Sequence, residues 1–184
     1  SRFGVLTGGP GTGKTTIVRI FADTVASLGG VVLLAAPTGR AARKLSEMTL
    51  RPAETLHKLL QFSFAERRFT RDQNNPLEAH LVIVDESSML DQVLAKALLR
   101  AISDKTAILL VGDADQLPSV GPGNVLKDII DALPGSTVRL TQVFRQAADS
   151  EIVHNAHRIC LGQMPLKGNN ILLGACTDAR ILIV

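Results

Sequence analysis

The feature that most constrains this chain is the segment GGPGTGKTT at residues 8–16. It contains the spacing G-x-x-x-x-G-K-T, after the apolar segment FGVLTG and before a helical pattern that runs to about Leu28. Glycines permit a tight turn whose backbone N–H groups point inward, and the N-terminus of the following helix adds a favourable potential for anions. In this strand-to-helix context the motif predicts a phosphate-binding loop rather than an ordinary glycine-rich turn.

Short apolar segments alternate with helical patterns along most of the chain. Strands are predicted at residues 3–8, 31–37, 81–87, 107–113 and 137–144, and helices at 13–28, 38–48, 89–102, 124–133 and 150–159. Strand-helix-strand alternation favours parallel pairing, and near-continuous apolar strands are typical of a sheet buried on both faces. The predicted class is α/β: a P-loop, three-layer fold with a mostly parallel sheet.

Length and composition set broader bounds. A chain of 184 residues, 46% of them hydrophobic, suits one domain with a small appendage. We expect a main domain at 1–146 with a small hairpin insertion at 61–78, and a C-terminal helix with short strands at 147–184. The net charge of +3 is compatible with a nucleic-acid partner without indicating one. Two cysteines without CxxC spacing favour a reducing, cytoplasmic setting, and the apolar runs are too short to span a membrane.

A pair of carboxylates ends the third predicted strand, in the segment LVIVDESSM. Beside a phosphate loop, Asp85 could hold Mg²⁺ through water, together with the hydroxyl of Thr15. Glu86 could polarise an attacking water as a general base, and Lys14 could reach the outer phosphates. The alternative is a solvated strand end, where charged residues are common.

The segment LLVGDADQLPSVGPG, residues 109–123, raises a similar question after the fourth predicted strand. Asp113 and Asp115 could be metal ligands or residues that shape a turn. Because Thr15 and Asp85 serve a metal better, we interpret the two aspartates as loop-shaping or water-mediated groups. Asn124 is expected to cap the helix that follows.

Six motifs together resemble one family. The segments GGPGTGKTT, APTGRAA, TLHKLL, VDESSML, GDADQLPSVGPGN and VFRQ occur in the order found in superfamily 1 DNA helicases. The chain is most similar to the RecD-like branch, which includes the exodeoxyribonuclease V alpha subunit, and the resemblance covers residues 3–165. It implies a RecA-like motor domain that uses ATP and Mg²⁺.

The resemblance also assigns roles to residues on the ATP side. It implies that the phosphate loop binds ATP and Mg²⁺ through Gly9, Pro10, Gly11, Thr12, Gly13, Lys14, Thr15 and Thr16. Asp85 and Glu86 would form the acidic motif. Gln116 would sense the terminal phosphate and couple it to DNA, and Arg145 would be an arginine finger.

A second set of positions resembles residues that contact single-stranded DNA: Thr38, Gly39, Arg40, Thr55, His57, Pro118, Ser119, Val120, Gly121 and Asn124. Backbone N–H groups at the start of the helix at 38–48 could bind a DNA phosphate, as the first loop binds ATP. Arg40 could instead lie on a solvated helix face, and a lone histidine such as His57 is usually structural.

The insertion interleaves aromatic and basic residues: Phe62, Phe64, Arg67, Arg68, Phe69 and Arg71. In relatives a small hairpin at this place helps to split the duplex. The phenylalanines could stack on bases or could simply pack on the core. Both interpretations stay open from the sequence.

The resemblance implies an ATP-dependent helicase or translocase that moves on single-stranded DNA, 5′ to 3′ as its relatives do, in DNA repair or recombination. A second RecA-like domain of the parent chain should complete the ATP site, so we expect weak nucleotide binding and little unwinding by these 184 residues alone. Subunits of a nuclease–helicase complex are possible partners. The alternatives are a non-catalytic nucleic-acid-binding subunit of such a complex and a P-loop kinase.

Overall fold

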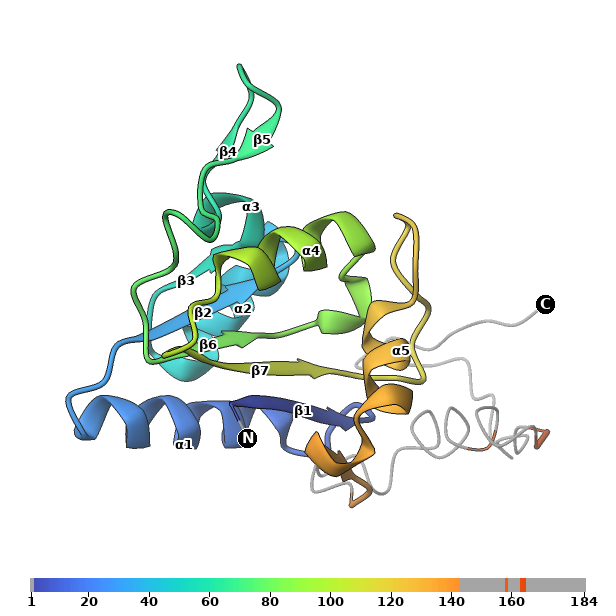
Figure 1. The fold of residues 1–184 in the computed structure, drawn as a ribbon. Helices are drawn as coiled ribbons and strands as arrows, with labels where there is room; N and C mark the ends of the chain where they lie inside the picture. The colour runs from blue at the N-terminus through green and yellow to red at the C-terminus, as the bar shows by residue number, and fades with distance from the viewer. Residues whose placement is uncertain (1, 143–157, 159–162, 165–184) are drawn as a thin grey trace, which may run out of the picture. The chain divides into compact units, whose positions relative to one another are not determined.

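The computed structural model describes residues 2–142, 158 and 163–164 (Figure 1). In chain order the elements are β1 (Phe3–Gly8), α1 (Lys14–Ser27), β2 (Val32–Ala36), α2 (Gly39–Thr49), β3 (Ala53–Thr55), α3 (Leu56–Leu59), β4 (Phe62–Ser63), β5 (Arg68–Phe69), β6 (Leu81–Val84), the 3-10 helix η1 (Ser87–Met89), α4 (Gln92–Ala101), β7 (Ala107–Gly112), α5 (Val125–Ala132), the 3-10 helix η2 (Pro134–Ser136) and β8 (Thr137–Leu140).

Six strands form one sheet in the order β3-β2-β6-β7-β1-β8, and every neighbouring pair is parallel. Parallel strands require crossover connections, and helices supply most of them here. This confirms the predicted α/β fold with a mostly parallel sheet. β6, β7 and β1 are consecutive in the sheet although they are far apart in sequence, which brings their carboxyl ends to one edge.

Alternate residues of the central strands face two separate cores. Val5, Val82 and Leu110 belong to the core that includes residues of α3, α4 and α5. Their chain neighbours Leu6 and Ile83 belong to the other core, formed with α1 and α2. Figure 1 shows α1 and α4 on opposite sides of the sheet. Because both faces are covered, the strands need apolar residues at nearly every position, as their sequences have.

The structure differs from the predicted elements around α4. The predicted helix at 89–102 begins at Gln92, because the carboxylate of Asp91 accepts the N–H of Leu94 at 2.8 Å and caps the helix there. Residues 87–89 form η1 instead. β3 and α3 were not predicted, since β3 has only three residues and contains the polar pair Glu54 and Thr55.

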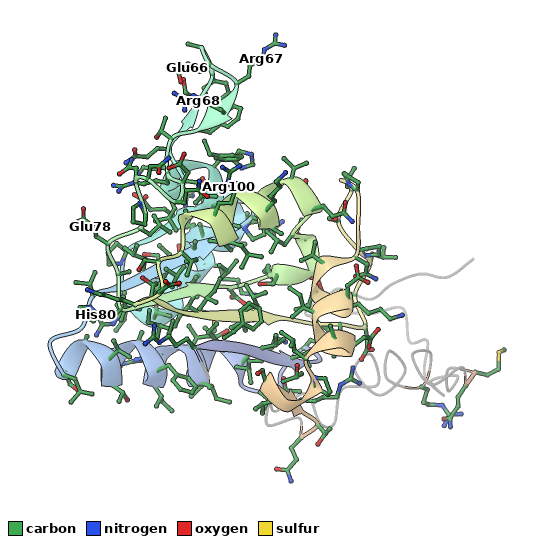
Figure 2. The ribbon with its side chains drawn as sticks, in the orientation of Figure 1. Glu66, Arg67, Arg68, Glu78, His80 and Arg100 are labelled. Carbon is green, nitrogen blue, oxygen red and sulfur yellow. The ribbon has the colours of Figure 1, made fainter. Side chains whose placement is uncertain are left out.

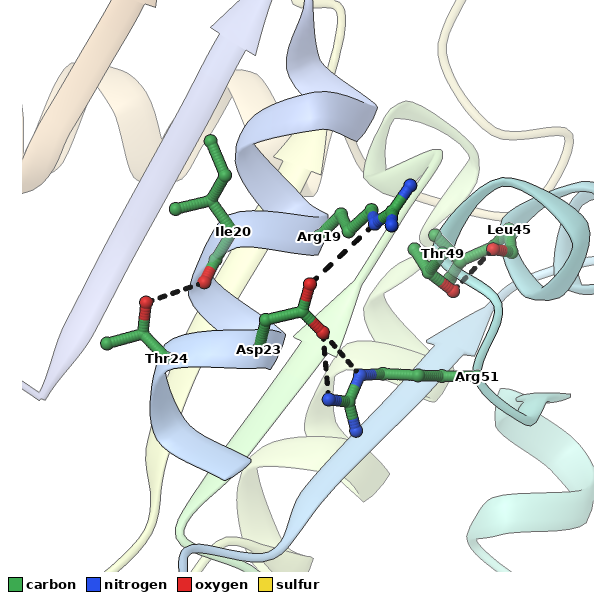
Figure 3. A network of polar contacts seen from close by, with 7 residues as sticks. All are labelled: Arg19, Ile20, Asp23, Thr24, Leu45, Thr49 and Arg51. Carbon is green, nitrogen blue, oxygen red and sulfur yellow. Dashed lines mark hydrogen bonds and ion pairs between the residues drawn. The ribbon is translucent and has the colours of Figure 1, made fainter. Parts of the chain in front are cut away.

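A charged network ties α1 to the connection between α2 and β3 (Figure 3). Arg51 donates from Nε and from its terminal nitrogen to one oxygen of Asp23, at 3.0 and 2.8 Å. Arg19, one turn earlier on α1, lies 3.7 Å from the other oxygen. All three side chains are partly exposed, so we expect a modest contribution to stability. The network fixes the relative position of the two helices that follow the first two strands.

The predicted insertion contains a short antiparallel hairpin of β4 and β5, in which Phe62 pairs with Phe69. Figure 1 shows it beyond α3, away from the six-stranded sheet. At its base, Arg71 donates to the carbonyl of Pro76 at 3.1 Å and to the side chain of Asn75 at 3.2 Å. The hairpin predicted within 61–78 is therefore confirmed.

By contacts, residues 1–145 form one compact unit and residues 146–184 another. The helix predicted at 150–159 and the short strands expected in the tail lie outside the described residues. Within the part of the chain that the structure describes, every helix is too short or too polar to cross a membrane.

Adjacent leucines on α4 give a matched test of the core. Leu98 is 1% exposed and Leu99 is 49% exposed. We expect Leu98→Ala to lower the free energy of unfolding by about 2–5 kcal/mol, because it removes buried methyl groups and leaves a cavity. Leu99→Ala should change it by about 0.5 kcal/mol or less. Urea unfolding of both variants measures the difference, and equal losses would contradict this packing.

Candidate nucleotide site

The turn between β1 and α1 has the geometry of a phosphate cradle. Gly11 and Gly13 adopt φ angles of 80° and 86°, which favour glycine. The hydroxyl of Thr12 donates to the carbonyl of Gly9 at 2.8 Å and holds the turn closed. Lys14 begins α1, and its Nζ donates to the carbonyls of Gly8 and Gly9 at 2.6 and 3.0 Å. The lysine is thus held over the loop at a helix N-terminus, where anions bind favourably.

The acidic segment after β6 forms a tight turn at the same edge of the sheet. The N–H of Asp85 donates to the carbonyl of Ala35 on β2 at 2.9 Å, and the carboxylate of Asp85 accepts the N–H of Glu86 at 2.9 Å. Glu86 has a φ of 52°, a left-handed conformation that costs energy for a residue with a side chain. This turn sends the chain directly into η1.

Burial raises the pKa of Asp85, because desolvation disfavours the charged carboxylate. The neighbouring carboxylate of Glu86 also raises the pKa, whereas the N–H of Glu86 and the positive charges of Lys14 and Lys44 lower it. The site therefore brings a partly buried carboxylate close to Lys14, and it disfavours the negative charge that the carboxylate would carry at neutral pH. A cation at this place would remove the penalty.

The loop after β7 is shaped by its first aspartate. Asp113 is 5% exposed, and its carboxylate accepts the N–H of Asp115 at 3.0 Å. Its carbonyl accepts the N–H of Gln116 at 3.2 Å. The N–H of Ala114 donates to the hydroxyl of Thr7 on β1 at 3.2 Å, which ties this loop to the strand before the phosphate loop. Through these hydrogen bonds, Asp113 stabilises the conformation of the loop that contains Gln116.

A side-chain contact links this loop to the acidic turn. The hydroxyl of Ser88 in η1 donates to Oε1 of Gln116 at 3.3 Å. Sequence reasoning did not select Ser88 or Thr7, since a single hydroxyl carries no pattern. The only sequence signal for them is their place at the ends of apolar strands.

Two of the predicted DNA contacts are helix caps. The hydroxyl of Thr38 accepts the N–H of Ala41 at the start of α2, and that of Thr55 accepts the N–H of Lys58 at the start of α3, both at 3.3 Å. Thr38 follows β2, and Thr55 is the last residue of β3, the parallel neighbour of β2. Both hydroxyls are therefore used as helix caps. Gly39 and Arg40, which follow Thr38 in the chain, are exposed.

The aromatic residues of the hairpin were predicted either to stack on bases or to pack on the core, and they do not all behave alike. Phe62 and Phe69 lie 5.0 Å apart, and His57 lies 5.8 and 5.6 Å from these two rings, so the three form one cluster at the base of the hairpin. Phe64 is 87% exposed. Figure 2 shows Glu66, Arg67 and Arg68 at the outer end of the hairpin. Packing therefore accounts for Phe62 and Phe69, whereas Phe64 stays accessible.

The loop at 118–121, which was predicted to contact DNA, is held by side-chain hydrogen bonds and also has exposed residues. The hydroxyl of Ser119 donates to the carbonyls of Gly121 and Gly123 at 3.0 and 3.2 Å, and Val120 is fully exposed. Pro118 is exposed beside them. Asn124 is the N-cap residue of α5 as expected, although its side chain makes no capping hydrogen bond. Its backbone carbonyl accepts the N–H of Asp128 instead.

The structure thus brings the phosphate loop, Asp85, Glu86 and Gln116 to adjacent strand ends. At the same edge, β3 ends at Thr55, and Thr38, Gly39 and Arg40 follow β2. Arg145 lies outside the described residues.

Comparison with known proteins agrees with this arrangement. Residues 1–122 match the family model described as AAA domain. The chain belongs to this family. It is 46% identical over 171 residues to the ATP-dependent RecD2 DNA helicase of Deinococcus radiodurans, covering 93% of this chain and 23% of the relative. It is 41% identical over 150 residues to the RecBCD enzyme subunit RecD of Mycobacterium tuberculosis, covering 69% of this chain and 26% of that subunit.

The predicted resemblance to RecD-like helicases is therefore confirmed over most of the chain, which spans about a quarter of the length of these two relatives. Solved structures support the fold. The arterivirus nonstructural protein 10 helicase with DNA superposes with a TM-score of 0.51 at 17% identity, over 90% of this chain and 42% of that one. The large terminase ATPase domain of Thermus phage P74-26 gives 0.53 at 12% identity, over 85% and 84%.

Asp85 generates a pH-dependent prediction. Since its pKa is raised in the folded protein, the folded state binds this proton more tightly than the unfolded state, and stability falls as pH rises from 3.8 through the raised pKa. Asp85→Asn keeps the oxygen that accepts the N–H of Glu86 and removes the charge. We expect this variant to be more stable than the unmodified chain at pH 7, with the gain vanishing below pH 3.8.

Urea unfolding across this pH range measures the difference between the two proteins. Asp104→Asn removes an exposed carboxylate and controls for net charge. A gain that is equal at both ends of the range would contradict the desolvation of Asp85.

Proposed function

We propose that this chain is the ATP-binding motor domain of an ATP-dependent DNA helicase of the RecD type, which couples ATP hydrolysis to movement on single-stranded DNA. The observation that carries the proposal is the convergence of three loops at the carboxyl ends of β1, β7 and β6. These loops bear the phosphate-binding glycines with Lys14, the amide of Gln116, and the carboxylates of Asp85 and Glu86. The names of the RecD relatives support the reaction.

The residues fit ATP with Mg²⁺. The backbone N–H groups from Gly11 to Thr16 bind the phosphates, and the ammonium of Lys14 exchanges its loop carbonyls for phosphate oxygens. Thr15 and Asp85 would hold the metal, because a hydroxyl and a carboxylate at the same edge of the sheet are oxygen ligands of the kind that Mg²⁺ prefers. Bound Mg²⁺ neutralises charge on the phosphate oxygens during transfer.

The remaining residues act on the attacking water and the terminal phosphate. Glu86 lies next to Asp85 in its strained turn and accepts a proton from the water as a general base. Gln116 donates its amide N–H groups toward the terminal phosphate. Arg145 supplies an arginine finger from beyond the described residues.

The DNA track lies at the same edge of the sheet. We assign it to the exposed start of α2 at Gly39 and Arg40, the end of β3 at Thr55, and the loop at 118–121. Backbone N–H groups at the start of α2 bind phosphates without reading sequence. His57 and Asn124 belong to this set from the resemblance, although His57 also packs on the hairpin aromatics.

The proposal extends to the parent protein. A second RecA-like domain would close the ATP site, movement would run 5′ to 3′, and the role would lie in DNA repair or recombination. Cytoplasmic location follows from that role. Subunits of a nuclease–helicase complex are candidate partners because several relatives are named RecBCD enzyme subunits.

Two other functions fit less well. A P-loop kinase needs an acceptor site and a lid with clustered arginines, and the described residues give neither feature. A non-catalytic subunit would have no need of Lys14, Asp85, Glu86 and Gln116 together in one site.

Lys14→Ala tests the ATP side. We expect it to weaken binding of a fluorescent ATP analogue to the chain by about 10- to 100-fold, since it removes charge-assisted hydrogen bonds to phosphate. In the parent protein at full length it should abolish ATP turnover stimulated by single-stranded DNA. Lys127→Ala, an exposed lysine on α5, should leave both unchanged. Turnover of the unmodified parent protein that does not respond to DNA would refute the motor.

Gln116→Ala tests coupling in the parent protein. ATP should bind with unaltered affinity because the phosphate loop is intact, while stimulation by single-stranded DNA should fall sharply. Steady-state ATP hydrolysis with and without an oligonucleotide measures both quantities. Normal stimulation would remove Gln116 from the mechanism.

A further inference from the structure

The contact between Ser88 and Gln116 joins two loops that are separated by 28 residues in sequence. Ser88 is 7% exposed and donates its hydroxyl to Oε1 of Gln116 at 3.3 Å. The distance is long for an O–H donor, and hydrogen bonds within sites often tighten when the ligand binds. Because Ser88 is buried and Gln116 is exposed, the serine is the fixed partner of the pair.

The position of Ser88 is set from two sides. The hydroxyl of its neighbour Ser87 donates to the carbonyl of Val84 at 2.8 Å, which ties η1 to the end of β6. On the other side η1 packs against the end of β7. A Cβ added to Gly112 would lie 3.1 Å from the N of Ser88 and 3.3 Å from the N of Ser87. A side chain at this position would crowd both backbones, so the glycine favours their close approach.

The position of Gln116 is set by the loop after β7. Asp113 accepts the N–H of Asp115 with its carboxylate and the N–H of Gln116 with its carbonyl. Ala114 is bound to Thr7 of β1. The backbone of Gln116 is therefore anchored, and the Ser88 hydroxyl holds its carboxamide with Oε1 toward η1.

The direction of this hydrogen bond has a chemical consequence. A glutamine amide has an acceptor oxygen and a donor nitrogen, and rotation by a half turn exchanges them. Donation from Ser88 to Oε1 fixes the oxygen toward η1, and within the described residues Nε2 makes no hydrogen bond. A phosphate offers only acceptor oxygens, so the amide must present Nε2 to it. The opposite orientation would place oxygen against oxygen.

We propose that Ser88 is a positioning residue that holds the carboxamide of Gln116 with its nitrogen toward the terminal phosphate. Since η1 follows Asp85 and Glu86 directly, the same contact links the acidic turn to the loop that carries Gln116. The inference rests on the proposed function, and it adds a residue that acts only through Gln116.

A double-mutant cycle in the parent protein tests this role. Ser88→Ala should lower DNA-stimulated ATP turnover about three- to tenfold, the loss expected for one net hydrogen bond, and leave the KM for ATP unchanged. Ser88→Ala combined with Gln116→Ala should behave as Gln116→Ala alone, because Ser88 has no other route to the phosphate. Ser88→Cys keeps a weak donor and should fall between serine and alanine.

Ser27→Ala, which removes an exposed hydroxyl from the end of α1, serves as the matched control. Thermal unfolding confirms that each variant is folded. The role of Ser88 would be overturned if the losses of DNA-stimulated turnover multiplied in the double variant, or if Ser88→Ala kept full stimulation. Either result would leave the motor proposal intact. An unmodified protein without DNA-stimulated turnover would overturn both.

Discussion

The parallel pairing of β6, β7 and β1 is the constraint on which the site depends. The register aligns Val84 with Leu110, and Thr7 with Gly112, so the three strands end together. Each strand is followed by a loop at this edge, outside the paired residues of the sheet. Residues separated by as many as 102 positions, Lys14 and Gln116, thereby follow strands of one central group. Rigid strands hold the loops, and the loops carry the polar chemistry.

The same edge holds features that cost stability. Glu86 has a left-handed backbone, and burial disfavours the charge of Asp85. The cores on the two faces of the sheet offset these costs, with Val18, Val82 and Ile83 fully buried. A site that binds a phosphate and a cation needs charged groups that its own fold does not fully stabilise. A nucleotide-binding fold therefore requires destabilising features at the site and stabilising cores elsewhere.

Most of the fold could be predicted because it depends on patterns spread over many residues. Apolar strands, such as residues 81–84, identify the sheet, and the glycine spacing of residues 8–15 identifies the cradle. The three-residue strand β3 has no such pattern, because it is defined by its pairing with β2. The start of α4 depended on one capping bond at Asp91, and α5 begins at Asn124 without a side-chain capping bond. Single contacts of this kind leave little trace in sequence.

The contacts that sequence could not reveal are also the ones that connect the loops. Thr7 joins β1 to the loop after β7, and Ser88 joins that loop to the turn after β6. Both are single hydroxyls, one near the end of β1 and the other in η1, and both contact the segment from Asp113 to Gln116. Gly112 lies close to the backbone of Ser87 and Ser88, so the segments after β6 and β7 pack against each other as well as sharing a hydrogen bond. Contacts of this kind give phosphate at one strand end a physical route to the loops at the neighbouring strand ends, which the proposed motor function requires.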